Sequence, residues 1–522
     1  MMNTMDEQTD SSEPAAPRRL SKSKFLAGLQ CLKRVYLEIH QPYLATPPDG
    51  ATRAMLDMGK EIGLVAQRRF PGGVLVAAGV RQREAALART AALLEDPAVP
   101  AIFEAAFECD GVFVRVDILE RKPGDEGGAS SWRLIEVKSS TKVKDLHLSD
   151  LAIQSYVLLQ AGIRLAGSCL MHINTGYRYE GEDLDLERLF AVEDVSEIVA
   201  KRRVEVPGLL TVMKERLTAP EPPPVEPGPH CLSPYECPFW AHCTKDKPDR
   251  WIYRLSGSKA AVEGLARQGI CTIDEIPPET PLSPLQRKIK DNVEWISPKL
   301  KAALESIRYP VHHVDFETIM PAVPRFMFTR PYQTIPMQWS NHIEDESGAV
   351  VHHEFLHDQP TEPRRRWAES LLESLGEQGT ICVYSAYEQA VIKQLMEDFP
   401  DFRPAFRQVL KRLWDLQAAI QAHYYHPDFA GSYSLKSVLP AMVRSVGYDD
   451  LTIRNGGQAA AAYHHMVFVE TDWVEQAATR DALMRYCARD TWALVQVRRT
   501  LSGKVSFPIA PRLIEDPAAN RP

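Results

Sequence analysis

The spacing of apolar residues in the first half of the chain predicts an alternation of helices and strands. Behind a cap at Ser21, SKSKFLAGLQCLKRVYLEIH places apolar side chains at helical intervals, and a second helical stretch runs through Phe70. Two β-branched runs, FVRVDILE and WRLIEVK, are separated by the turn-rich PGDEGGASS and predict adjacent strands. A helix over about 148–161 and a strand over SCLMHINTGYRY follow. This half of the chain is therefore predicted to be of the α/β class.

A proline-rich segment, APEPPPVEPGP at 219–229, predicts an extended and fairly stiff spacer. Residues 250–308 then have helical spacing, and from Tyr309 a second α/β pattern begins. Within it VHHVDFETI and GTICVYSAYE are predicted strands, amphipathic helices follow each, and a last helix covers about 475–500. The predicted organisation is a disordered tail at 1–18, an α/β domain at 19–248, a helical connector at 249–308 and a second α/β domain at 309–510.

The charge balance limits the partners that the chain can have. Its formal net charge is -8 at pH 7, so contacts with nucleic acid have to come from local basic patches rather than from a generally basic surface. No run approaches the roughly 18 apolar residues of a membrane span, and the N-terminus is polar without an apolar signal core. We therefore expect a cytoplasmic protein without a membrane partner.

Charged residues on the two strands of the first region supply candidate chemistry. Asp117 lies near the end of one strand, and Glu136 and Lys138 lie two apart on the next, so both project from one face. Carboxylates can hold a divalent cation that lowers the pKa of bound water and offsets phosphate charge, while a lysine orients the attacking water. A surface strand with alternating charges gives the same pattern by chance. The spacing resembles the core triad of the PD-(D/E)XK nuclease superfamily, in particular its RecB-like branch, which implies a restriction-endonuclease-like fold.

The same resemblance implies further site residues on neighbouring helices. The family places an acidic residue or histidine on an earlier helix, for which Glu61 is the candidate. It also places a glutamine on the helix after the triad, and Gln154 matches that position. A tyrosine normally follows this glutamine by four residues, whereas Tyr156 follows it by two.

The cysteines indicate a different kind of metal site. Nine cysteines in a chain without a secretory signal argue against a disulfide framework, and five scattered ones are interpreted as small buried residues. The other four have one member before the predicted nuclease core and three after it at equal intervals: Cys31, Cys231, Cys237 and Cys243. Four thiolates can enclose an iron-sulfur cluster or Zn2+, with His230 or His242 as an alternative zinc ligand. The arrangement resembles the cluster-bearing nucleases of the RecB-like branch, which implies a 4Fe-4S cluster with a structural role.

The second α/β region carries another acidic set. Asp315 and Glu317 lie on one face of a strand in HHVDFET, the spacing with which a carboxylate pair can share a two-metal site. Near the other end, Tyr486 and Asp490 lie four apart in YCARDTWA, one turn along a helix. These residues resemble the DEDD exonucleases of the RNase H-like fold, in the variant with tyrosine. The resemblance implies that Asp315, Glu317 and Asp490 bind Mg2+ or Mn2+ and that Tyr486 positions the attacking water.

The middle motif of the DEDD exonucleases normally supplies a further aspartate after an aromatic residue. In VYSAYEQAVI that place is held by Glu388, whose longer side chain can still reach a metal ion, and Asp415 in RLWDL is the alternative. Lys436 in GSYSLKSVLPAM is a candidate contact to a nucleic-acid backbone, with a solvated helix face as the other interpretation.

The whole arrangement resembles an uncharacterised bacterial family that pairs a RecB-like nuclease domain bearing iron-sulfur cysteines with a C-terminal DEDD-type exonuclease domain. It implies a metal-dependent nuclease with a RecB-like site and a second, 3′-5′ exonuclease-like site, acting on DNA in preference to RNA, in repair or defence. Two alternatives stay open: an RNA-processing exonuclease active only in the C-terminal domain, and a catalytically decayed scaffold that binds nucleic acid.

Overall fold

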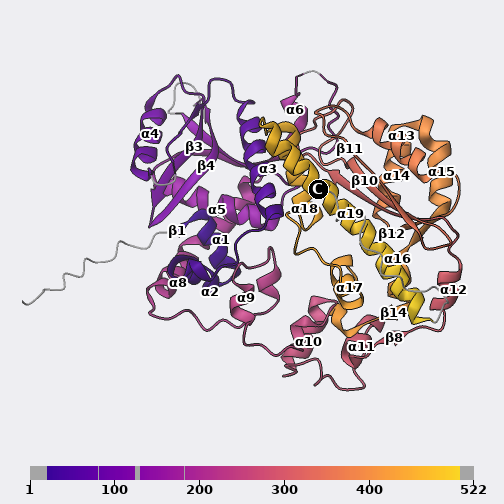
Figure 1. Ribbon diagram of the computed structural model, residues 1–522. Coiled ribbons are helices and arrows are strands. Elements are labelled where there is room, and N and C mark those ends of the chain that lie inside the picture. The colour runs from indigo at the N-terminus through magenta and orange to yellow at the C-terminus, as the bar shows by residue number, and fades with distance from the viewer. Residues whose placement is uncertain (1–19, 80–81, 124–129, 182, 506–522) are drawn as a thin grey trace, which may run out of the picture. The chain divides into compact units, whose positions relative to one another are not determined.

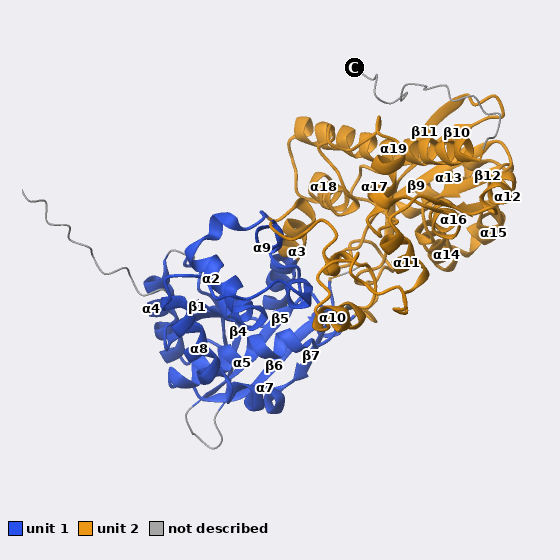
Figure 2. Ribbon diagram, turned by 90° about the horizontal axis from the view of Figure 1, so that it is seen from below, with its two compact units in different colours: residues 1–47, 59–174, 184–245 blue, residues 48–58, 175–183, 246–522 orange. Residues whose placement is uncertain are grey.

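A computed structural model describes residues 20–79, 82–123, 130–181 and 183–505 (Figure 1). The chain divides into two compact units: unit 1 comprises 1–47, 59–174 and 184–245, and unit 2 comprises 48–58, 175–183 and 246–522 (Figure 2). Each unit combines helices with a mixed sheet, so the predicted α/β class is confirmed. The predicted tail at 1–18, most of the turn PGDEGGASS and the last residues of the predicted second domain lie outside the described residues.

The sheet of unit 1 is mixed and has the strand order β2-β3-β4-β5-β6-β7, with β1 paired to β4. Strands β2 and β3 run parallel, as do β5 and β6 and also β1 and β4, whereas the other neighbours are antiparallel. The bounds are β1 (Leu20–Ser21), β2 (Val74–Leu75), β3 (Ala101–Cys109), β4 (Val112–Lys122), β5 (Ser131–Lys138), β6 (Leu165–Ile173) and β7 (Phe190–Asp194).

Helices cover this sheet and bury its apolar residues. Helix α5 packs against β3, β4 and β6, and α4 packs against β3. Leu151, Ile153 and Val157 of α5 join Val116 and Leu134 of the strands in one core. The bounds are α1 (Lys22–Gln30), α2 (Leu32–His40), α4 (Arg83–Glu95), α5 (Asp145–Gln160), α6 (Leu186–Leu189), α7 (Ser196–Arg203), α8 (Val206–Thr218) and α9 (Trp240–Thr244), while α3 (Gly50–Gln67) contributes residues to both units.

The main sheet of unit 2 has the order β11-β10-β9-β12-β13. The pairs β11/β10 and β10/β9 are antiparallel, and the pairs β9/β12 and β12/β13 are parallel. A second, two-stranded sheet pairs β8 with β14. The bounds are β8 (Trp295–Ile296), β9 (Val311–Ile319), β10 (Ile335–Glu344), β11 (Val350–Leu356), β12 (Thr380–Val383), β13 (Leu413–Asp415) and β14 (Tyr424–Tyr425).

The two faces of this main sheet carry different side chains because residues alternate along β9. Val314 and Phe316 belong to an apolar core that they share with α13, α14 and α15. His313 and Asp315 project from the opposite face, where both contact residues of the long helix α19, Arg498 and Cys487 respectively. Figure 1 shows α19 running along the sheet. The acidic residues of β9 therefore lie between the sheet and this helix.

Besides the first part of α3, ten α-helices are described in unit 2, and three of them occupy the region predicted as a helical connector. Their bounds are α10 (Lys259–Arg267), α11 (Pro284–Asp291), α12 (Leu300–Glu305), α13 (Arg364–Leu375), α14 (Tyr387–Asp398), α15 (Arg403–Arg412), α16 (Leu416–His423), α17 (Leu435–Met442), α18 (Gly456–Phe468) and α19 (Trp473–Lys504). Among the described helices, none combines the length and the apolar character needed to cross a membrane.

Candidate metal centres

Three carboxylates meet between β9 and α19 in unit 2. Asp315 and Glu317 of β9 and Asp490 of α19 each place one carboxylate oxygen within 4.8 Å of the other two. Within the part of the chain that the structure describes, this is the one group of His, Cys, Asp and Glu side chains close enough to share a single metal ion. The structure thus brings together the three residues that the sequence predicted as metal ligands of this region.

Burial and mutual repulsion raise the pKa of these carboxyl groups. For Asp315, burial is the largest cause, and the negative charges of Asp490, Glu317 and Glu388 add to it. For Glu317, burial and then Asp490 raise the pKa to about 8, although Lys436 acts in the opposite direction. Clustered carboxyl groups with raised pKa values are destabilised as anions, and a divalent cation between them would relieve that cost.

Of the two sequence candidates for a further acidic ligand, Glu388 is the one whose charge raises the pKa of both Asp315 and Glu317. Its side chain is buried, burial raises its pKa to about 8, and its Oε2 accepts no hydrogen bond from the described residues. A buried carboxylate oxygen without a donor fits a metal ligand. Asp415 instead caps α16, where it accepts from the backbone N–H of Ala418 at 2.9 Å and of Ser385 at 3.2 Å.

Two tyrosines and a lysine border the acidic cluster. Tyr486, one turn before Asp490, donates a hydrogen bond to its carboxylate, and the Tyr448 hydroxyl donates to Asp490 Oδ1. Burial and then Asp490 raise the pKa of both tyrosines, which keeps them as O–H donors at neutral pH. Lys436 Nζ lies 5.5 Å from each tyrosine ring centroid. The sequence did not predict Tyr448, because it lies in an irregular segment between α17 and α18 without a fixed spacing to Asp490.

A second polar set gathers in unit 1 around Glu136. Lys138 Nζ donates to Glu136 Oε1 at 2.6 Å and to Asp150 Oδ2 at 2.7 Å. Gln154 Nε2 donates to Glu136 Oε2 at 2.8 Å and to Asp150 Oδ1 at 3.0 Å. Glu136, Lys138 and Gln154, which the sequence placed on a strand and on the following helix, are therefore in direct contact.

Asp117 lies beside this set because the pairing of β4 with β5 ends next to it. Their ladder stops at the pair Ile118 and Ile135, so the next residue of each strand, Asp117 and Glu136, projects from the same face. Asp117 Oδ2 then accepts from the backbone N–H of Val137 at 2.8 Å. The prediction that Asp117 lies near the end of its strand is wrong, because β4 continues past it.

The charges in this set act on one another strongly. Burial and then Glu136 raise the pKa of Asp117 to about 7, against the influence of Lys22 and Lys138. Burial alone would raise the pKa of Glu136, but the ammonium groups of Lys138 and Lys22 and the hydrogen bonds hold it below its usual range. Burial would lower the pKa of Lys138, yet Glu136 and Asp150 raise it, so Lys138 is firmly protonated.

Two members of this set were not predicted. Lys22 Nζ lies 2.9 Å from Glu136 Oε1 and 3.9 Å from carboxylate oxygens of Asp117 and Asp150. Lys22 precedes Glu136 by 114 positions, so no local spacing could reveal the contact. Asp150 lies one helical turn before Gln154 on α5, and this spacing was the available signal.

Two further residues, Tyr156 and Glu61, were weaker candidates for the site around Glu136. Tyr156 is not part of the set around Glu136, since its hydroxyl lies 3.4 Å from Asp110 Oδ2 in an exposed contact. Glu61 lies half-buried on α3, and its role in the site stays a prediction.

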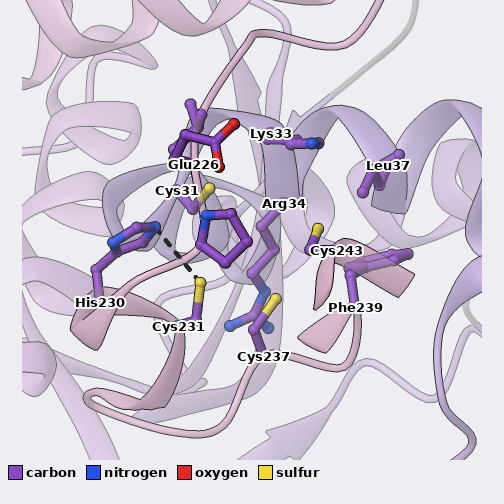
Figure 3. A pocket seen from close by; sticks show the side chains of 12 residues that line it. Cys31, Lys33, Arg34, Leu37, Glu226, His230, Cys231, Cys237, Phe239 and Cys243 are labelled. Carbon is purple, nitrogen blue, oxygen red and sulfur yellow. Dashed lines mark hydrogen bonds between the residues drawn. The ribbon is translucent and has the colours of Figure 1, made fainter. Parts of the chain in front are cut away.

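The four cysteines predicted to bind a cluster line one cavity of unit 1 (Figure 3). All four are free thiols, and the figure shows their side chains arranged around a common space: Cys31, Cys231, Cys237 and Cys243. His230 also lines the cavity, with Nε2 3.5 Å from Cys231 Sγ, whereas His242 is not among the described lining residues. Burial raises the pKa of the Cys231 and Cys243 thiols, and that of Cys237 to about 11.

A glutamine fastens α1 to the loop that carries the later cysteines. Gln30 Nε2 donates to the backbone carbonyls of His230 at 2.8 Å, Ser233 at 3.2 Å and Tyr235 at 2.8 Å. Cys31 follows as the C-cap of α1. The Gln30 side chain thus ties the segment that precedes Cys31 to the distant loop that contains Cys231.

One family resemblance was found by comparison with known proteins. Residues 312–434 match a protein family described as a domain of unknown function, DUF2779. The matched stretch contains Asp315, Glu317 and Glu388 and ends before Tyr486 and Asp490. No curated protein matches the chain.

Proposed function

We propose that this protein is a metal-dependent nuclease that hydrolyses phosphodiester bonds, with one site in each unit. The observation that carries the proposal is the group Asp315, Glu317 and Asp490, whose carboxylate oxygens lie within 4.8 Å of one another. Mg2+ and Mn2+ prefer such oxygen ligands. On this proposal unit 2 is an RNase H-like domain of the DEDD type, unit 1 is a PD-(D/E)XK domain of the RecB-like type, and DNA is the preferred substrate.

In unit 2 the side chains have separate roles toward the substrate. Asp315, Glu317 and Asp490 hold the metal ions, and Glu388 adds a further oxygen ligand. A bound metal ion supplies charge that offsets the phosphate and lowers the pKa of the attacking water. Tyr486, a protonated donor beside Asp490, orients that water through a hydrogen bond rather than acting as a base.

In unit 1 the proposed ligands are Asp117 and Glu136. Gln154 fixes the orientation of the Glu136 carboxylate by a hydrogen bond of 2.8 Å. Lys138 donates to Glu136 and Asp150, and their charges raise its pKa, so its proposed role is to orient the water and to stabilise negative charge on the phosphate.

For the cysteine cavity we propose a 4Fe-4S cluster with a structural role. Burial raises the pKa of three of these thiols, so the thiolates that ligate a metal form only when the metal displaces their protons. Four cysteine side chains line the one cavity, which is the ligand set of a 4Fe-4S cluster, and Zn2+ is the alternative occupant.

The test is cleavage of end-labelled single- and double-stranded DNA and RNA with Mg2+ or Mn2+. Wild type is compared with Glu136→Ala/Lys138→Ala for unit 1 and with Asp315→Ala/Asp490→Ala for unit 2. Two exposed carboxylates, one in each unit, provide matched controls in Glu215→Ala and Glu369→Ala. We expect each site variant to lose its own part of the product pattern, while both controls cleave like wild type.

The outcomes separate the competing functions. Cleavage that survives the unit 1 variant, is lost in the unit 2 variant and is confined to RNA favours an RNA-processing exonuclease. An absence of cleavage by protein prepared anaerobically, on all four substrates, contradicts the proposal and favours a scaffold that binds nucleic acid.

A further inference from the structure

The carboxylate of Glu136 is saturated with hydrogen-bond donors from this chain. Oε1 accepts from Lys22 at 2.9 Å and from Lys138 at 2.6 Å, and Oε2 accepts from Lys22 at 3.1 Å and from Gln154 at 2.8 Å. A carboxylate offers about four lone-pair sites, so these four contacts leave no position for a metal ion. If Glu136 binds a metal, at least one donor has to leave.

The three donors differ in how firmly they are held. Lys138 and Gln154 both have a second carboxylate partner in Asp150, at 2.7 Å and 3.0 Å. The hydrogen bonds described for Lys22 go to Glu136 alone, and the oxygens of Asp117 and Asp150 lie 3.9 Å from its Nζ. The Lys22 and Lys138 side chains are exposed to nearly the same extent, 25% and 26%, so the difference between them lies in their partners. Lys22 is therefore the donor that a metal ion displaces most easily.

The position of Lys22 at the start of α1 also favours its displacement from Glu136 by a metal ion. Lys22 is the first residue of α1, behind the Ser21 cap. The N-terminus of a helix attracts anions and disfavours cations, so a lysine there is held by its carboxylate partners against the local field. The same field favours a phosphate group.

We propose that Lys22 acts as a replaceable counter-ion of the unit 1 site. In the metal-free protein Lys22 compensates the charge of Glu136. A divalent ion takes its place on Glu136, and the released ammonium group then binds the substrate phosphate beside the N-terminus of α1. The proposal deepens the proposed nuclease function of unit 1 and rests on it.

The experiment measures Mn2+ binding by calorimetry in the full chain with Asp315→Asn and Asp490→Asn, so that the unit 2 site is silent. Lys22→Met is compared with Lys24→Met, which removes a lysine two positions on in the same helix, and with Glu136→Gln. We expect Lys22→Met to bind Mn2+ about tenfold more tightly, since a charged competitor is gone, and Lys24→Met to match the parent. At saturating Mn2+, Lys22→Met should cleave more slowly, and Lys22→Arg should recover part of the rate.

The opposite changes in metal affinity and cleavage are the signature of a replaceable counter-ion. A structural role for Lys22 predicts that both weaken together, and that result overturns the inference. Equal Mn2+ affinity in Lys22→Met and the parent, with binding lost in Glu136→Gln, overturns the inference alone and leaves the nuclease proposal intact. If neither protein shows Mn2+ binding that depends on Glu136, the nuclease proposal for unit 1 fails and the inference fails with it.

Discussion

Two groups of buried charge in unit 2 differ in how far their charges are compensated. Glu344, fully buried on β10, forms ion pairs with Arg498 and Arg499 of α19. Around Asp315, by contrast, the charges that act most strongly on the carboxyl group are other carboxylates. A compensated buried charge stabilises the packing of α19 on the sheet, whereas an uncompensated cluster suits a cation that arrives later.

Breaking the compensated pair should cost stability without touching the acidic cluster. Arg498→Met leaves Glu344 buried with one partner fewer, and we expect the free energy of unfolding to fall by about 3–5 kcal/mol in urea titrations. Combining it with Glu344→Leu should restore part of that loss, because the buried carboxylate is gone and Arg499, which is partly exposed, keeps its hydrogen bond to the Gly348 carbonyl. A loss of stability no larger than that of an exposed arginine variant would contradict this account.

Removing one charge from the uncompensated cluster should instead make the metal-free protein more stable. Asp315→Asn relieves repulsion with Glu317 and Asp490, so we expect the metal-free protein to be more stable by about 1 kcal/mol, as is common for functional residues. The same variant should no longer gain thermal stability from Mn2+. Glu369→Gln, an exposed carboxylate on α13, is the control that should change neither quantity.

The two sequence candidates for the further acidic ligand can be separated by the same measurements. Glu388→Gln keeps the shape of the side chain but removes its charge, and we expect the affinity for Mn2+ to fall by about tenfold or more. Asp415→Ala removes the cap of α16, which should cost about 1 kcal/mol of stability and leave the Mn2+ affinity unchanged. The reverse pattern would identify Asp415 as the ligand.

The local patterns within single strands and helices account for the part of these sites that the sequence could predict. Alternation along β9 placed Asp315 beside Glu317, and the one-turn spacing on α19 placed Tyr486 beside Asp490. That the two pairs meet was implied by the resemblance to the DEDD exonucleases, and the structure shows the contact. Lys22 was missed because β1 brings the start of α1 to β4 through a pairing between positions 20 and 112, which no local pattern encodes.

Helix α1 connects two features of unit 1 that are separate in chemistry. It begins at Lys22, in contact with Glu136, and ends at its C-cap Cys31, which lines the cysteine cavity. Nine helical residues span roughly 13 Å at 1.5 Å per residue. The proposed metal cluster at Cys31 would therefore fix one end of the helix whose other end supplies Lys22.

Loss of a cysteine ligand should consequently prevent binding of the proposed cluster and lower the thermal stability of the protein. In Cys31→Ser we expect anaerobically prepared protein to lose its absorbance near about 400 nm and to unfold at a lower temperature. Cys271→Ser, which changes an exposed cysteine of unit 2, should retain both properties. Absorbance that persists in Cys31→Ser would exclude Cys31 as a ligand.

At the scale of the whole molecule, neither unit is a continuous stretch of chain. Unit 2 includes residues 175–183, and this segment is bound by backbone hydrogen bonds from Tyr179 N–H to Thr329 at 3.0 Å and from Phe328 N–H to Tyr179 at 2.7 Å. A fragment that begins after the predicted first domain would lack these partners. Unit 2 therefore needs this early segment, and its stability as a function of pH should be measured on the full chain.

Buried histidines reduce the stability of the folded protein on the acid side of its pH optimum, and buried carboxyl groups reduce it on the alkaline side. Burial, followed by the charge of Arg412, lowers the pKa of His312 to about 4. Such a group stabilises the folded state above its unfolded pKa near 6.5, and that stability is lost as the pH falls toward 4. Burial and Asp490 raise the pKa of Glu317 to about 8, so its contribution is present at low pH and is lost as the pH rises from about 4.5 to 8.

Metal-free protein should therefore be most stable between about pH 4.5 and 6.5, where the two dependences oppose each other, and should lose stability beyond both limits. On the acid side, a single histidine shifted as far as His312 accounts for about 3 kcal/mol, and His312→Asn should flatten that slope. On the alkaline side, Mg2+ should restore stability, because it replaces the protons that the carboxyl groups around Asp315 release. Thermal midpoints measured from about pH 4 to 9, with EDTA or with Mg2+, test both limbs. An equal effect of Mg2+ on the acid limb would show that its binding is not governed by these carboxyl groups.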